Sequence, residues 1–110
     1  MKEPEQIYRV LLESGNNMAD AEHDFRLLSD STKSLLAQIT INVRTEQNCS
    51  MAEAGSVALA SSVYRDHLVA TSEAHRLAEK AKILYYSSKT LSDLYRSKEA
   101  TERASMPRAT

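Results

Sequence analysis

The sequence has very few of the residues that make turns, with two glycines and two prolines among 110 residues. Barrels, sandwiches and other folds built from many short strands need such residues at nearly every turn. Their scarcity excludes those folds and predicts an all-α chain. The length is that of one domain with a modest core, so we predict a single helical domain over 1–110.

Cysteines and long apolar runs are also lacking. Cys49 is the only cysteine, which excludes an intramolecular disulfide framework and favours a reducing compartment. No segment approaches the roughly 18 consecutive apolar residues that span a membrane, and the charged start of the chain does not resemble a signal peptide. We therefore expect a cytoplasmic protein with no membrane contact.

An excess of charge of either sign is absent, because 14 basic residues face 15 acidic ones and leave a net charge of −1. This balance excludes attachment to nucleic acid or anionic lipid by bulk charge alone. The charges are nevertheless unevenly distributed: 6 basic and 11 acidic residues lie in 1–75, whereas 8 basic and 4 acidic residues lie in 76–110. A local basic patch is therefore expected near the C-terminus.

A long helix is predicted in the first half of the chain. Mainly apolar side chains, six of seven, recur there at alternating spacings of 3 and 4 residues, which is the repeat of a helix packed along another helix. The members of this repeat are Met18, Ala21, Phe25, Leu28, Thr32, Leu35 and Ile39. They predict a helix over 17–45. A separate helix over 4–13 is expected before it, with Pro4 in its first turn and Gly15 suited to the left-handed C-terminal cap that follows it.

Two further helices are predicted in the second half. Ser50 and Glu53 have the spacing of a capping box and predict a short helix over 51–60. A second helical repeat then predicts a helix over 62–104. Its members are Val63, His67, Ala70, Ala74, Leu77, Ala81, Leu84, Ser88, Leu91 and Tyr95. Since the first repeat is rich in large residues and the second in alanine, we expect the two long helices to form an antiparallel, coiled-coil-like hairpin.

No catalytic, cofactor-binding or metal-binding residues are predicted. His67 and His75 are eight residues apart on one predicted helix, too far to share a metal ion, and no glycine-rich phosphate loop exists. The sequence thus predicts neither an enzyme nor a small-molecule substrate. His67 is expected to be partly buried and hydrogen-bonded across the hairpin, with a pH-sensing role as the alternative.

Basic residues form one stripe along the last predicted helix. They recur every seven residues with Tyr86 nearby, a pattern suited to phosphates and stacked bases. The stripe consists of Lys82, Lys89, Arg96 and Arg103. The alternative is an ordinary solvated face, because Glu79, Asp93 and Glu99 lie at pairing distance from Lys82, Arg96 and Arg103 respectively.

Apolar residues near the end of this helix lie beyond the reach of the first long helix, which is predicted to begin at 17. They are Leu84, Leu91, Leu94 and Tyr95. We expect them to be covered by the first short helix, by a second copy of the chain or by a protein partner.

Three segments resemble small bacteriophage proteins of unassigned function. They are the acidic and aromatic stretch Ala21-Glu22-His23-Asp24-Phe25, the alanine-rich stretch Met51-Ala52-Glu53-Ala54, and the tail from Leu94 to Met106. In this tail Tyr95 stands where those proteins often have tryptophan. The resemblance implies a helical hairpin encoded near phage recombination and single-strand-binding genes, and hence a protein of the host-cell cytoplasm.

Two functions follow as hypotheses. The first is a non-enzymatic interaction or adaptor protein that self-associates or docks on a protein partner. The second is a nucleic-acid-binding accessory of phage recombination or replication that uses the basic stripe of the last helix.

Overall fold

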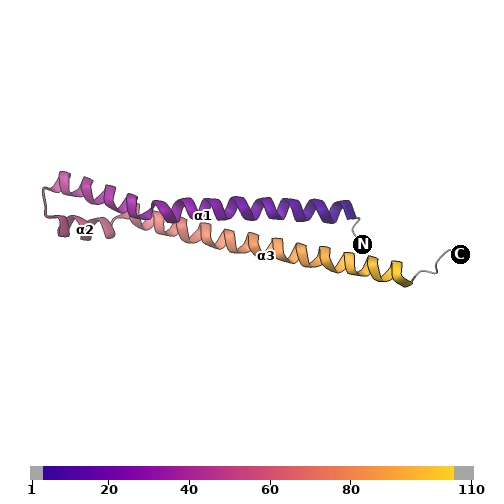
Figure 1. Ribbon diagram of the computed structural model, residues 1–110. Coiled ribbons are helices and arrows are strands. Elements are labelled where there is room, and N and C mark those ends of the chain that lie inside the picture. Colours follow the sequence, from indigo (N-terminus) through magenta and orange to yellow (C-terminus); the bar gives the residue numbers. More distant parts are fainter. Residues whose placement is uncertain (1–3, 106–110) are drawn as a thin grey trace. The chain divides into compact units, whose positions relative to one another are not determined.

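The computed structural model describes residues 4–105 and confirms the all-α prediction. It contains three helices, α1 (Pro4–Gln47), α2 (Met51–Leu59) and α3 (Ser62–Ser105), and no strand within residues 4–105 (Figure 1). The chain divides into two compact units. We call Asp20–Ala78, which includes α2, the turn unit, and the described residues 4–19 with 79–105 the terminal unit.

The turn unit is an antiparallel hairpin of α1 and α3, as predicted. Thr32 Oγ1 and His67 Nε2 share a hydrogen bond of 2.8 Å. Two helical turns away, the rings of Phe25 and His75 lie 4.8 Å apart between centroids, at an interplanar angle of 57°. From Phe25 to Thr32 the residue numbers rise along α1, whereas those of the residues they contact fall from His75 to His67 along α3. The two helices therefore run antiparallel. The predicted hydrogen bond of His67 across the hairpin is confirmed.

The predicted repeat on α1 is also confirmed, because all its members are half-buried. They are Met18, Ala21, Phe25, Leu28, Thr32, Leu35 and Ile39. The same spacing continues towards the N-terminus through half-buried Ser14, Leu11 and Ile7. The side of α1 that faces α3 is thus longer than the sequence repeat alone indicated.

The short helix α2 closes the turn unit beside the C-terminal end of α1 (Figure 1). Asn48 takes a left-handed conformation after α1, with φ 48°. Ser50 caps α2 as predicted, since its hydroxyl accepts a hydrogen bond of 3.2 Å from the Glu53 N–H. Ala54 and Ala58, one turn apart, are completely buried. The methyl groups of Ala54 and Ala58 therefore hold α2 in place through close contacts, and larger side chains would not fit at these two positions.

The predicted break between 13 and 17 is wrong, because α1 continues through Gly15. Gly15 has no positive φ, so it does not act as a left-handed cap. Instead, a Cβ atom at Gly15 would lie 3.3 Å from Tyr85 Cε2. The tyrosine ring of α3 therefore lies close to the backbone at Gly15, and a larger residue there would require the ring to shift. A glycine inside a helix costs only about 1 kcal/mol, which packing within the terminal unit can offset.

The inner face of α3 differs from the predicted repeat at every second member, where the inward residue is the one that follows the predicted residue in the sequence. The buried and half-buried residues between 62 and 95 are Tyr64, His67, Thr71, Ala74, Ala78, Ala81, Tyr85, Ser88, Ser92 and Tyr95. The predicted repeat places five further residues inside that are in fact exposed, namely Val63, Ala70, Leu77, Leu84 and Leu91. In the turn unit, α1 presents large side chains and α3 turns Ala74 and Ala78 inward, whereas in the terminal unit α1 has Gly15 and the inner side chain of α3 is Tyr85. These leucines of α3 are left outside.

Candidate interaction surface

Large aliphatic side chains cover the outer side of α3 in the terminal unit. Their exposed fractions are 64% for Ile83, 62% for Leu84, 65% for Leu91 and 61% for Leu94. We call these four residues the outer aliphatic face. On the inner side of the same stretch, Ser92 is only 5% exposed. The helix therefore buries a serine while leaving three leucines and an isoleucine in contact with water, the reverse of the usual arrangement.

Local sequence explains why the large side chains cannot all be buried. Ile83, Leu84, Tyr85 and Tyr86 are consecutive, and successive residues of an α-helix point about 100° apart. They must surround the helix, so only part of the run can face α1. Tyr85 takes the inner position against Gly15. Its ring and that of Tyr86 lie edge to face, with 5.3 Å between their centroids. Ile83 and Leu84 are thereby directed outward.

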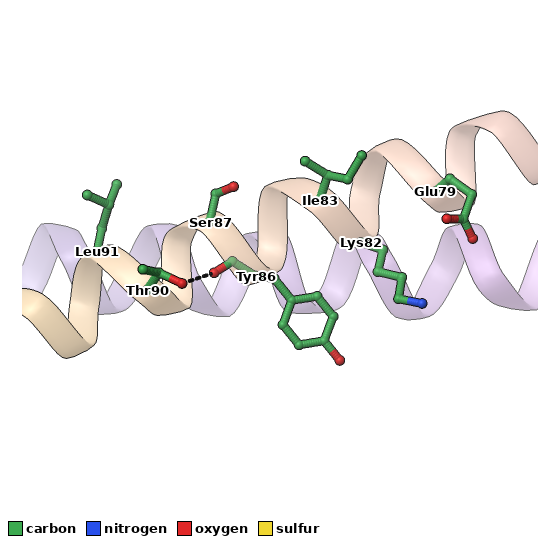
Figure 2. A pocket seen from close by; sticks show the side chains of 7 residues that line it. All are labelled: Glu79, Lys82, Ile83, Tyr86, Ser87, Thr90 and Leu91. Atoms are coloured by element: carbon green, nitrogen blue, oxygen red, sulfur yellow. Dashed lines mark hydrogen bonds between the residues drawn. The ribbon is translucent and has the colours of Figure 1, made fainter.

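A shallow hollow lies on this side of α3 and is lined by α3 alone. Figure 2 shows Lys82 and Tyr86 on one side of it and Ile83, Ser87 and Leu91 on the other. Thr90 lies between them, and its hydroxyl donates a hydrogen bond of 2.9 Å to the Tyr86 carbonyl. Glu79 completes the lining. The hollow is thus an open, largely apolar strip with one charged flank, suited to another helix rather than to an enclosed small molecule.

The basic stripe is fully on the surface. All four of its members are exposed. Of the three acid–base spacings noted in the sequence, the Arg103–Glu99 salt bridge is present with an N–O distance of 3.8 Å. Among residues 4–105, Lys82, Lys89 and Arg96 make no salt bridge. The explanation of the stripe as an internally paired face therefore applies to Arg103 alone.

The residues predicted as a partner surface do not all share one side of α3. Leu84, Leu91 and Leu94 are exposed, as a surface for a partner requires. Tyr95 is half-buried and lines a hollow between α1 and α3 with Ile7, so it belongs to the interior of the hairpin. Sequence reasoning missed Ile83, which the unbroken apolar run after Lys82 could have indicated.

Other sites are not apparent in the part of the chain that the structure describes. No three histidine, cysteine or acidic side chains within residues 4–105 are grouped in a way that could hold a metal ion. Over the same residues no helix combines the length and apolarity that crossing a membrane requires. Cys49 is a free thiol and half-buried.

Comparison with known proteins assigns no family. No protein-family model matches the chain, and searches of curated proteins and of solved structures found no match. The interpretation of function therefore depends on the surface of the terminal unit.

Proposed function

We propose that this protein is a non-enzymatic helical interaction protein that self-associates through the outer aliphatic face of α3. The observation that supports this proposal is the exposure of Ile83, Leu84, Leu91 and Leu94, each more than 60% accessible to solvent. An exposed apolar strip of this kind marks an interaction surface in soluble proteins. Complete burial of one such side chain gains about 2 kcal/mol, so four together offset much of the cost of association.

Removing two of these side chains is the direct test. The double variant Leu84→Gln with Leu91→Gln keeps good helix-forming residues and leaves the α1-facing side unchanged. We expect its self-association to weaken by at least about 2 kcal/mol, which corresponds to roughly a thirtyfold rise in the dissociation constant. Size-exclusion chromatography with light scattering over a concentration series measures this.

A matched control is available on α1. Leu12 and Leu27 are also exposed, at 53% and 58%, and lie outside the outer aliphatic face. The variant Leu12→Gln with Leu27→Gln makes the same chemical change and should associate like the unmodified chain. Equal weakening by both double variants would contradict a role for this face of α3.

The second candidate is binding of single-stranded nucleic acid by the basic stripe. It is favoured by one observation, namely that Lys82, Lys89 and Arg96 are exposed and make no salt bridge among residues 4–105. Tyr86, half exposed at 50%, adds a ring on which a base could stack. The net charge of −1 provides no long-range attraction, which is why we rank this candidate second.

Fluorescence anisotropy with a labelled oligonucleotide decides between the two functions. If the stripe binds phosphates, the affinity should fall steeply with salt, and each contact removed should lower the logarithmic slope by about 0.7. Replacing all four stripe residues with glutamine should then abolish binding. We expect instead no micromolar binding by the unmodified chain. Salt-sensitive binding that the four-glutamine variant loses would contradict this ranking.

We include the biological process and the compartment in the same proposal. The resemblance to small phage proteins supports a role in phage recombination or replication, within the host cytoplasm. The lone Cys49 is a free thiol, which is compatible with a reducing compartment.

A further inference from the structure

We propose that the partner of the outer aliphatic face is the same face of a second copy, lying antiparallel about a two-fold axis that passes between Ser87 and Ser88. This inference rests on the proposed function and specifies its geometry. Two-fold dimers, in which one patch meets itself, are the commonest soluble oligomers. In such a dimer of antiparallel helices, the residues read along the patch in one direction must be complementary to the same residues read in the opposite direction.

The order of charges along α3 meets that requirement. The midpoint between Lys82 and Asp93 falls between Ser87 and Ser88, and so does the midpoint between Glu79 and Arg96. In an antiparallel pair centred there, Lys82 of one copy lies across from Asp93 of the other. Glu79 lies across from Arg96 in the same way. Each two-fold dimer therefore contains four opposed pairs of opposite charge.

Two of the four residues of the outer aliphatic face have the same centre. Leu84 and Leu91 are placed symmetrically about the point between Ser87 and Ser88, so each leucine lies level with the other leucine of the second copy. Ile83 and Leu94, by contrast, have no such counterpart on the exposed side. Tyr86 and Lys89 are also symmetrical about this point, which places an ammonium group near an exposed ring, a favourable cation–π arrangement. Small Ser87 at the centre allows two helices to approach closely.

The flanks of the hollow agree with this pairing. In Figure 2, Lys82 and Tyr86 lie on one side of the strip, whereas Ile83 and Leu91 lie on the other. A two-fold axis across two antiparallel helices brings each flank against the same flank of the second copy. The charged flanks of the two copies then meet with acidic residues across from basic ones, and the apolar flanks of the two copies meet each other.

Lys82 and Asp93 are suited to pair between copies. Both are exposed, and neither makes a salt bridge among residues 4–105. They lie on α3 at positions that do not face α1, so reversing their charge leaves the hairpin contacts in place. These two residues therefore report on the register of the dimer without altering the fold.

A charge-swap experiment tests the register. In a dimer of Asp93→Lys, Lys82 of each copy lies across from the new lysine at position 93 of the other copy. In a dimer of Lys82→Asp, Asp93 of each copy lies across from the new aspartate at position 82. We expect each variant alone to dimerise roughly tenfold more weakly than the unmodified chain, as opposed pairs become repulsive. An equimolar mixture restores every opposite-charge pair, so heterodimers should form with nearly the affinity of the unmodified dimer. Native mass spectrometry separates the three species by mass.

Two variants on α1 serve as controls for net charge. Glu13→Lys and Arg9→Asp make the same charge changes at exposed positions of α1, and should associate like the unmodified chain, alone or mixed. Circular dichroism of each variant checks that the helices remain.

Each result bears on the proposal separately. Weak homodimers together with a strong heterodimer support the antiparallel register. If the unmodified chain dimerises but the mixture binds no more tightly than either variant alone, the register is wrong while self-association stands. If the unmodified chain remains monomeric, the proposed self-association and this register both fail.

Discussion

Replacing Ala54 with glutamate is expected to destabilise the chain by about 3 kcal/mol, because a carboxylate would be placed where a buried methyl group now lies. Ala54 is completely buried, and its N–H already donates a hydrogen bond of 2.9 Å to the Ser50 carbonyl. α2 has nine residues, too few to be stable alone in water. It depends on this contact, so we expect α2 to separate from the hairpin.

Ala52 provides the control for this prediction. It lies on the same helix, two residues earlier, and is exposed. Ala52→Glu introduces the same side chain near the same helix end, so propensity and helix-dipole effects are nearly equal. Urea unfolding followed by circular dichroism should show a change below about 0.5 kcal/mol for Ala52→Glu. Similar losses for both variants would show that burial of α2 is not what stabilises it.

Truncating Phe25 to alanine is the second large effect we expect. A fully buried phenylalanine contributes about 3–5 kcal/mol in such a test. Phe25 is half-buried and contacts the ring of His75, so we expect a loss of about 2 kcal/mol. Its neighbour Leu27, 58% exposed, is the control, and Leu27→Ala should cost less than about 1 kcal/mol. If Leu27→Ala were the more damaging change, the inner face of α1 would be assigned wrongly.

The helical content and the antiparallel hairpin could be predicted from the sequence because both depend on strong, local signals. The repeat from Met18 to Ile39 has an unbroken spacing of 3 and 4, and its members are half-buried. The capping spacing of Ser50 and Glu53 placed the start of α2 correctly. Such signals need no knowledge of the partner helix.

Gly15 shows where local signals fail. Glycine followed by two asparagines is typical of a helix end, but the cost of keeping these residues helical is about 2 kcal/mol in total. Packing across the terminal unit, which includes the ring of Tyr85 against Gly15, decides otherwise. The sequence of α1 alone does not contain that information.

The one-residue shift on α3 has a similar cause. A hydrophobic repeat places Leu77, Leu84 and Leu91 inside, because large apolar residues are normally buried. On α3 the neighbouring positions Ala78, Tyr85 and Ser92 are inside instead. Which of two adjacent stripes faces α1 depends on the space that α1 leaves at each level, as the ring of Tyr85 against Gly15 shows. The candidate surface could therefore be named from the sequence only in part, through Leu84, Leu91 and Leu94.

Sedimentation equilibrium of the unmodified chain tests self-association through α3 most directly. At low micromolar concentration the mass should approach that of one chain, 12.3 kDa. As the concentration rises to high micromolar, we predict a mass approaching twice that value, with the Leu84→Gln and Leu91→Gln double variant remaining at the mass of one chain. A mass of 12.3 kDa for the unmodified chain at every concentration would contradict the proposal that the outer aliphatic face binds a second copy.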